Sequence, residues 1–317
     1  MPTLRCIAPA LVPCMMMAAG LASAQNYPDR PIRLLTPPPG GSTEFTSRLL
    51  ADAVAPGLGQ RFVIEGRPGQ VGAEIAAQAP ADGYTVLHFT NLIWLMPLFR
   101  KVSWDPARDF APVAMTIITP NIVVVHPSLP AKTIKELIAL AKARPDELNY
   151  GSGSTGAANH VAAELFKSMA GVNLVRINYK GAGTAIIDLV AGQLQVMFAT
   201  AGSVSPHIKS GRLRALAVTS AEPSALVPGL PTVALAGLPG YESASMSAMF
   251  VPVKTPPAII QRLNQEVVRG LNRPEVKDRL FAAGVQVVAS TPEAAATKIK
   301  SETARMGNVI RDAGLRE

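Results

Sequence analysis

Two short stretches of the sequence combine glycine with hydroxyl side chains just before an expected helix. A glycine-rich helix start leaves several backbone N–H groups without partners, close to the positive end of the helix dipole. Such an end can hold a carboxylate or a phosphate, and Ser or Thr hydroxyls add further donors. We therefore predict two anion-binding cradles. The first cradle is Pro39, Gly40, Gly41, Ser42 and Thr43, and the second is Ser152, Gly153, Ser154, Thr155 and Gly156.

The second cradle also lies inside a match to the dinucleotide fingerprint G-x-G-x-x-G at residues 151–156. That fingerprint needs an acidic residue roughly 20 positions further on, where it holds the ribose hydroxyls. The stretch from Val172 to Ile177 contains no acid. We therefore expect no nicotinamide cofactor, and the sequence indicates no other cofactor.

Residue types that dominate catalytic and metal sites are present but scattered. No H-E-x-x-H, G-x-S-x-G or Walker sequence occurs, and no histidine has a partner at metal-ligand spacing. The four histidines are His88, His126, His160 and His207. We expect no metal site and no catalytic residue. One enzymatic alternative stays open: a periplasmic hydrolase or isomerase that acts on an organic acid through Ser154, His160 and a carboxylate.

The first 24 residues have the order of a secretory signal peptide. Arg5 supplies a basic start, an apolar run follows over residues 7–21, and residues 22–24 (Ala-Ser-Ala) fit a cleavage pattern. We predict that residues 1–24 are a signal peptide, cleaved after Ala24, and that the protein is periplasmic. Both cysteines, Cys6 and Cys14, lie in that segment, so the mature chain has no thiol for a disulfide or a metal.

Composition and charge narrow the classes of partner. The 317 residues include 30 Lys and Arg against 22 Asp and Glu, a net charge of +8, and 48% are hydrophobic. This apolar content excludes a mainly disordered chain. The basic residues are scattered without interleaved aromatic side chains, which argues against nucleic acid. The positive charge is either a solvated surface or a field that attracts a small anion.

The rest of the chain alternates short β-branched runs with amphipathic helices, which is typical of α/β proteins with a largely parallel sheet. Thr133 and Glu136 form a capping box for a helix that follows them. We expect two α/β halves. Strands are predicted at residues 31–35, 61–64, 84–87, 121–125, 172–177, 194–198 and 215–219, and helices at 42–54, 73–78, 157–169, 183–189 and 255–271, with two more from 274 and 290.

A series of motifs in fixed order covers essentially the whole mature chain. It resembles the Bug family, the extracytoplasmic solute receptors of tripartite tricarboxylate transporters. The matching stretches include Tyr27-Pro28-Asp29-Arg30-Pro31-Ile32, Gly40-Gly41-Ser42-Thr43, Arg67-Pro68-Gly69, Asp82-Gly83-Tyr84-Thr85, Asn149-Tyr150-Gly151-Ser152, Tyr179-Lys180-Gly181, Pro206-His207-Ile208-Lys209-Ser210-Gly211 and Pro231-Thr232-Val233.

The resemblance implies a type 2 periplasmic-binding-protein fold, an α/β architecture of two lobes joined by crossing hinge strands. Lobe 1 would comprise residues 25–124 and 249–317, and lobe 2 residues 125–248. The lobes would close on a small organic carboxylate, a di- or tricarboxylate or an aromatic acid, and deliver it to the membrane permease subunits of a tripartite tricarboxylate transporter. We expect a monomer. The resemblance leaves open whether the bound acid is instead presented to a signalling partner.

The resemblance also adds residues to the two cradles as expected ligand contacts. These are Thr90, Asn91, Asn159, Tyr179, Lys180, Gly181, Ala199 and Thr200. The chain departs from the family pattern at Ala199, where an Asp is common. An Asp there could pair with an ammonium group, so its loss favours a plain organic or aromatic acid over an amino acid.

Overall fold

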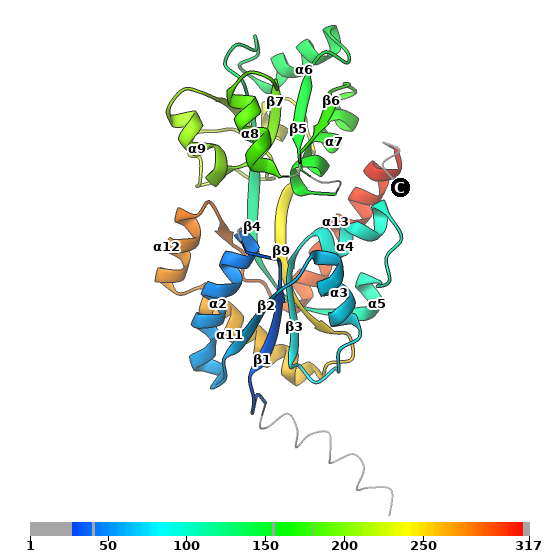
Figure 1. Cartoon of the computed structure of the whole chain (residues 1–317), viewed down its shortest axis with the longest axis vertical. Coiled ribbons are helices and arrows are strands. Elements are labelled where there is room, and N and C mark those ends of the chain that lie inside the picture. The colour runs from blue at the N-terminus through cyan, green and yellow to red at the C-terminus, as the bar shows by residue number, and fades with distance from the viewer. Residues whose placement is uncertain (1–26, 40–41, 154–155, 180, 313–317) are drawn as a thin grey trace, which may run out of the picture.

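The strands of the protein form one hydrogen-bonded sheet that runs through two α/β halves (Figure 1). The computed structural model describes residues 27–39, 42–153, 156–179 and 181–312. Within this part the main strand order is β2-β1-β3-β9-β4-β7-β5-β6, with β8 and β10 both paired to β4. Because β4 and β9 lie in the middle of this order, they join the two halves.

The first half contains the first and the last of the described residues. Strand β1 pairs in parallel with β2 and β3, and helices cover both faces of these strands. Its elements are β1 (Ile32–Thr36), α2 (Ser42–Leu58), β2 (Phe62–Gly66), α3 (Gly69–Ala77), β3 (Thr85–Thr90), α4 (Leu92–Phe99), α5 (Pro106–Asp109), α11 (Pro257–Leu271), α12 (Pro274–Ala282), β10 (Gln286–Val287) and α13 (Pro292–Asp312).

The second half is formed by the middle of the chain. Strand β5 pairs in parallel with β6 and β7, so the carboxyl ends of these three strands share one edge. Its elements are α6 (Ile134–Ala143), β5 (Asn149–Ser152), α7 (Ala158–Ala170), β6 (Val175–Asn178), α8 (Ala182–Val190), β7 (Val196–Thr200), α9 (Ala201–Lys209), β8 (Arg214–Val218) and α10 (Val233–Ala236).

Two long strands cross between the halves: β4 (Phe110–Val125) and β9 (Ala244–Pro252). They pair with each other antiparallel over most of their length. Beyond residue 120, β4 leaves β9 and pairs with β7 and β8 of the second half. Strand β9 pairs with β3 of the first half. The crossing therefore places residues 119–121 of β4 at the junction.

Apolar clusters fill both faces of the sheet in the second half, and the alternation of side chains along each strand decides which face a residue joins. Val123 and Phe198 lie in the cluster under α6 and α7. Ile122 and Ala199 lie in the cluster on the opposite face, with side chains of α8 and α9. Ala199 therefore belongs to the face of β7 that packs on α8 and α9.

Most of the predicted elements are confirmed, with ends that differ by a few residues. The N-cap bond of the predicted capping box is also confirmed, because Thr133 Oγ1 accepts a hydrogen bond from the N–H of Glu136 at 3.1 Å. The return bond differs, because Glu136 Oε2 accepts from the N–H of Lys132 at 2.6 Å and not from that of Thr133. The prediction was wrong about β4, which begins at Phe110 and not at residue 121. Pro112 and Pro120 interrupt the β pattern there, and the pairing with β9 shifts register near Pro112. The predicted lobe boundaries stay a prediction.

Candidate functional site

Two cavities meet at Thr200, where β7 ends and α9 begins. The smaller cavity, about 270 Å³, lies at the carboxyl edge of the second half. It is lined by Asn121, Gly153, Ala157, Ala158, Asn159, Gly181, Ala182, Phe198, Ala199, Thr200 and Ser245. The larger cavity, about 610 Å³, lies between the halves, and its lining is Ser42, Glu44, Phe45, Thr119, Thr200, Gly202, Ser203 and Ala283.

Three helices begin at the smaller cavity. They are α7, α8 and α9, whose N-cap residues Ala157, Gly181 and Thr200 all line it. None of these N-caps makes a side-chain capping bond to a described residue, and none of the three helices has an acidic residue in its first turn. Their first N–H groups and the positive ends of their dipoles therefore converge on one space, an arrangement that favours an anion.

Asn121 supplies a buried side-chain donor to the same cavity. Its backbone is fixed by Thr219: the N–H donates to Thr219 Oγ1 at 2.9 Å, and the carbonyl accepts from the Thr219 N–H at 2.9 Å. Only 1% of Asn121 is exposed, yet its Nδ2 has no hydrogen-bond partner within the described residues. The sequence analysis missed this residue, because Asn121 opens a β-branched run that indicates only a strand.

The second cradle is held from behind by side chains of β6 and α7. Arg176 Nε donates to Ser152 Oγ at 2.7 Å, and its Nη2 donates to the Gly153 carbonyl at 2.8 Å. Asn159 Oδ1 accepts from the N–H groups of Gly153, at 3.4 Å, and His160, at 3.0 Å. These bonds fix the loop, and Gly153 and Asn159 line the smaller cavity.

His160 is a buried neutral imidazole behind the second cradle. Its Nδ1 accepts a hydrogen bond from the Gly156 N–H at 3.2 Å. Burial, helped by the charge of Arg176, lowers the pKa of His160 to about 4. Because Nδ1 already accepts this bond, it is not available as a base. Ser154, its partner in the enzymatic alternative, lies outside the described residues.

The first cradle is built differently, since the side chains at the start of α2 are engaged in a buried network. Thr43 Oγ1 and Ser247 Oγ of β9 are 2.8 Å apart. One turn on, Ser47 Oγ lies 2.6 Å from His88 Nδ1, and His88 Nε2 lies 2.8 Å from Thr116 Oγ1 of β4. Burial lowers the pKa of His88 to about 3, so this imidazole is neutral too. The network ties the start of α2 to both crossing strands.

Glu44 lies in the first turn of α2 and is buried. It pairs with Arg48 one turn further along the helix. Glu44 lines the larger cavity, whereas the described lining of the smaller cavity contains no charged side chain. Glu44, which directly follows the first cradle, thus places a carboxylate in the lining of the larger cavity.

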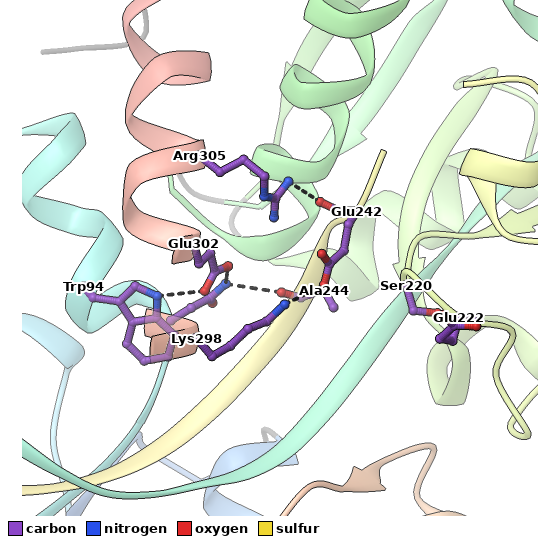
Figure 2. A network of polar contacts seen from close by, with 9 residues as sticks. Trp94, Ser220, Glu222, Glu242, Ala244, Lys298, Glu302 and Arg305 are labelled. Carbon is purple, nitrogen blue, oxygen red and sulfur yellow. Dashed lines mark hydrogen bonds and ion pairs between the residues drawn. The ribbon is translucent and has the colours of Figure 1, made fainter. Parts of the chain in front are cut away.

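Asn91 was predicted to contact the ligand, but its side-chain amide donates hydrogen bonds to the first residue of β9 and to α13. Its Nδ2 donates to the Ala244 carbonyl at 3.2 Å and to Glu302 Oε1 at 3.1 Å. Glu302 also accepts from Trp94 Nε1 at 2.8 Å, and burial raises its pKa. Figure 2 shows this network and its continuation along α13, where Lys298 and Arg305 both reach Glu242.

The structure brings together some of the predicted ligand contacts and places others elsewhere. Gly153, Asn159, Gly181, Ala199 and Thr200 line the smaller cavity, and Ser42 lines the larger one. The remaining described candidates are not among the lining residues, and these are Pro39, Thr43, Thr90, Asn91, Ser152, Gly156 and Tyr179. Gly40, Gly41, Ser154, Thr155 and Lys180 lie outside the described residues, as does the predicted signal peptide. Every ligand contact in this set stays a prediction.

Metal-binding clusters and membrane-spanning helices are both absent from the described residues. No group of three His, Cys, Asp or Glu side chains lies close enough there to hold a metal ion. Within the same ranges no helix has the length and hydrophobicity needed to cross a bilayer.

Known proteins resemble this chain over nearly all of its length. The protein BugT of Bordetella pertussis is 34% identical over 315 residues, which covers 96% of this chain and 97% of BugT. A Pseudomonas protein encoded between tcbD and tcbE is 33% identical over 290 residues, 90% of this chain and 86% of that protein.

Solved structures extend the likeness to three dimensions. Rpa4515 of R. palustris, solved with adipate, superposes with a TM-score of 0.78 at 35% identity, covering 91% of this chain and 98% of that one. The periplasmic binding protein BugD superposes with a TM-score of 0.75 at 30% identity, covering 92% and 99%. These neighbours confirm the predicted periplasmic-binding-protein fold of two α/β lobes.

The family model described as "tripartite tricarboxylate transporter family receptor" matches residues 46–315. This family consists of solute-binding receptors, so the expectation that the protein is not an enzyme is confirmed. The chain belongs to the tripartite tricarboxylate transporter receptor family, the family that includes the Bug proteins.

Proposed function

We propose that the protein is a periplasmic receptor for a small organic carboxylate, which it delivers to the membrane permease subunits of a tripartite tricarboxylate transporter. Residues 1–24 would be removed as the signal peptide, and the receptor would act as a monomer. The observation that carries the proposal is the convergence of the N-termini of α7, α8 and α9 on one cavity, with N-cap residues that make no side-chain capping bond to a described residue. A carboxylate satisfies those donors without any covalent chemistry.

The ligand class is a di- or tricarboxylate or an aromatic acid. Two relatives support the dicarboxylate part of this range: Rpa4515 was solved with adipate, and MatC of Rhodopseudomonas palustris was solved with malate. MatC is 27% identical to this chain, with a TM-score of 0.76, and the match covers 90% of this chain and all of MatC. Ala199 lines the smaller cavity, and no described lining residue there is acidic. An ammonium group would therefore find no opposite charge in that cavity, which supports a plain acid over an amino acid.

Binding would proceed by closure of the two halves. The larger cavity is lined from α2 on one side and from the start of α9 on the other. A ligand that bridges these surfaces stabilises the closed state by as much as its affinity for that state exceeds its affinity for the open one. The crossing strands β4 and β9 would carry the change of angle.

A thermal-shift screen of organic acids followed by calorimetric titration tests the proposal. We expect a raised melting temperature with at least one carboxylate, and tighter binding of succinate than of aspartate. Mass spectrometry of the bound acid after incubation should recover it unchanged. Turnover of the acid would contradict the receptor function, and a clear preference for aspartate would contradict the ligand class.

A further inference from the structure

We propose that the side-chain amide of Asn121 donates a hydrogen bond to a ligand carboxylate, which makes this residue of the crossing strand β4 a determinant of affinity. The inference rests on the proposed function and names a residue that recognises the ligand. It starts from the unpaired donor at Nδ2.

A buried donor without a partner is costly, so its presence at a cavity indicates a group that a ligand completes. Within the described residues, three buried side-chain atoms lack a partner: Asn121 Nδ2, His207 Nδ1 and Thr255 Oγ1. Of these three residues only Asn121 lines the smaller cavity. The hydrogen bonds between Thr219 and the Asn121 backbone hold Asn121 in place, which leaves the side-chain amide free to face a ligand without moving the strand.

The position of Asn121 relative to the three helix starts suits a carboxylate. Asn121 lies directly opposite Thr200 in the pairing of β4 with β7, and Thr200 is the N-cap of α9. The N-caps of α7 and α8 line the same cavity. A carboxylate has about four acceptor positions, more than the N–H groups of one helix can fill in good geometry. The amide would therefore supply a donor from a direction that the helices do not cover.

Neighbouring polar residues extend this contact along the crossing strands. Thr119 lies two residues before Asn121, so both side chains are on the same face of β4. Thr119 lines the larger cavity, and it is paired with Ser245 of β9, which lines the smaller one. Thr119, Asn121 and Ser245 thus form a polar floor on the two strands that connect the halves. A ligand held by Asn121 would therefore contact the crossing strands that connect the two halves.

The test replaces the donor by groups of the same size. Asn121→Asp turns the amide into a carboxylate, and we expect at least a hundredfold weaker binding of adipate, malate or succinate near pH 7. Because two carboxylates cannot share the cavity while both are ionised, residual binding should take up about one proton. Titration calorimetry in buffers of different ionisation enthalpy measures that proton. The wild type should take up none.

Asn121→Leu keeps the volume but removes the donor, and we expect binding about tenfold weaker. The ligand-free melting temperature of this variant should equal or exceed that of the wild type, because an unpaired buried amide is gone. A merely structural Asn121 would give the opposite shift. Asn308→Asp, an exposed residue of α13, changes the charge by the same amount and should leave binding unaltered.

The outcomes separate the inference from the function on which it rests. If the wild type binds at least one of the three acids and Asn121→Asp binds it within threefold without proton uptake, the inference is overturned and the receptor function stands. If the wild type binds none of the three, the proposed function fails for these acids and the inference fails with it. Loss of binding with proton uptake in the Asp variant supports both.

Discussion

The helix that opens the first half and the three helices that open onto the smaller cavity begin in different ways. At the start of α2, the hydroxyls of Thr43 and Ser47 bond to the crossing strand β9 and to His88, and Glu44 adds a negative charge. The N-cap residues of α7, α8 and α9 make no side-chain capping bond to a described residue, and no acid lies in the first turns of these helices. In α7 the His160 N–H donates to Asn159 Oδ1.

This difference indicates that the two halves have different roles in the proposed binding of a ligand. The second half has free donors and positive helix ends, so it is suited to recognise the charge of the ligand. The first half has its polar groups already satisfied in a rigid network tied to β4 and β9, so it is suited to close over a ligand that is already bound. The two cradles that the sequence predicts therefore differ in how their side chains are engaged.

The strongest test of this difference is a bulky side chain in each cradle. Gly153→Leu would fill the smaller cavity, and we expect at least a hundredfold loss of affinity. Ser42→Leu, on the larger cavity, should cost far less. Gly153→Ala is the matched control: a Cβ there would lie 3.7 Å from Asn159 Oδ1, an ordinary contact. Calorimetric titration measures all three variants, and equal losses at residues 42 and 153 would contradict the different roles of the halves.

Each half buries one neutral histidine, which predicts how stability depends on pH. Both folded pKa values, about 4 for His160 and about 3 for His88, lie below the usual 6.5. The unfolded chain therefore binds more protons, and stability is lost as pH falls below 6.5. Each histidine should contribute up to ~1.4 kcal/mol per pH unit between about pH 6.5 and 5.5. The free energy of unfolding, measured by urea denaturation at several pH values in this range, should fall with decreasing pH. The His160→Gln variant should show roughly half of that pH dependence. An unchanged pH dependence would place His160 in a more exposed setting.

Closure should depend on a glycine contact between the halves. A Cβ at Gly202, in the first turn of α9, would lie 3.0 Å from the carbonyl oxygen of Ala283, and one at Gly284 would lie 2.8 Å from the Gly202 nitrogen. Gly202→Val should keep the halves apart and weaken binding about fivefold without changing ligand-free stability. Small-angle scattering should show a larger ligand-bound radius of gyration. Gly183→Val, in the first turn of α8 with open space around it, is the control. Normal compaction of the Gly202 variant would show that this contact does not limit closure.

The smallest effect should come from the carboxylate of Glu44, which directly follows the first cradle. Glu44→Gln removes a negative charge beside the larger cavity, and we expect about threefold tighter binding of a dicarboxylate at low salt. The gain should shrink as ionic strength rises. Binding weakened by this substitution would mean that the pairing of Glu44 with Arg48, and not its repulsion of the ligand, dominates.

The fold could be predicted wherever the pattern is local. The apolar periodicity from residue 257 and the capping box at Thr133 place α11 and α6 without tertiary information. Strand β4 could not be bounded in this way, because it takes partners from both halves and contains Pro112, next to a shift of register, and Pro120. Helix α4, with the sequence LIWLMPLF, is apolar on every side and buried, so it shows no helical stripe.

The site could be predicted only in part, for the same reason. Glycine-rich helix starts are visible in the sequence, and Gly153 and Gly181 do line the smaller cavity. Asn121 and Ser245 reach that cavity because two distant strands cross there, and no local pattern marks them. Asn91 shows the converse case: its place after β3 indicates a pocket loop, but its amide bonds to Ala244 and Glu302.

The network along α13 has a consequence for how the molecule is completed. Trp94 Nε1 and the Asn91 amide belong to segments made early, yet both donate to Glu302, which lies in the last helix. Arg305 of the same helix donates to the Glu242 carbonyl at 2.5 Å, just before β9 begins. A chain that stops short of this helix would leave these buried donors without their acceptor. The last helix therefore bonds to segments from two distant parts of the sequence, and its removal should destabilise the start of β9.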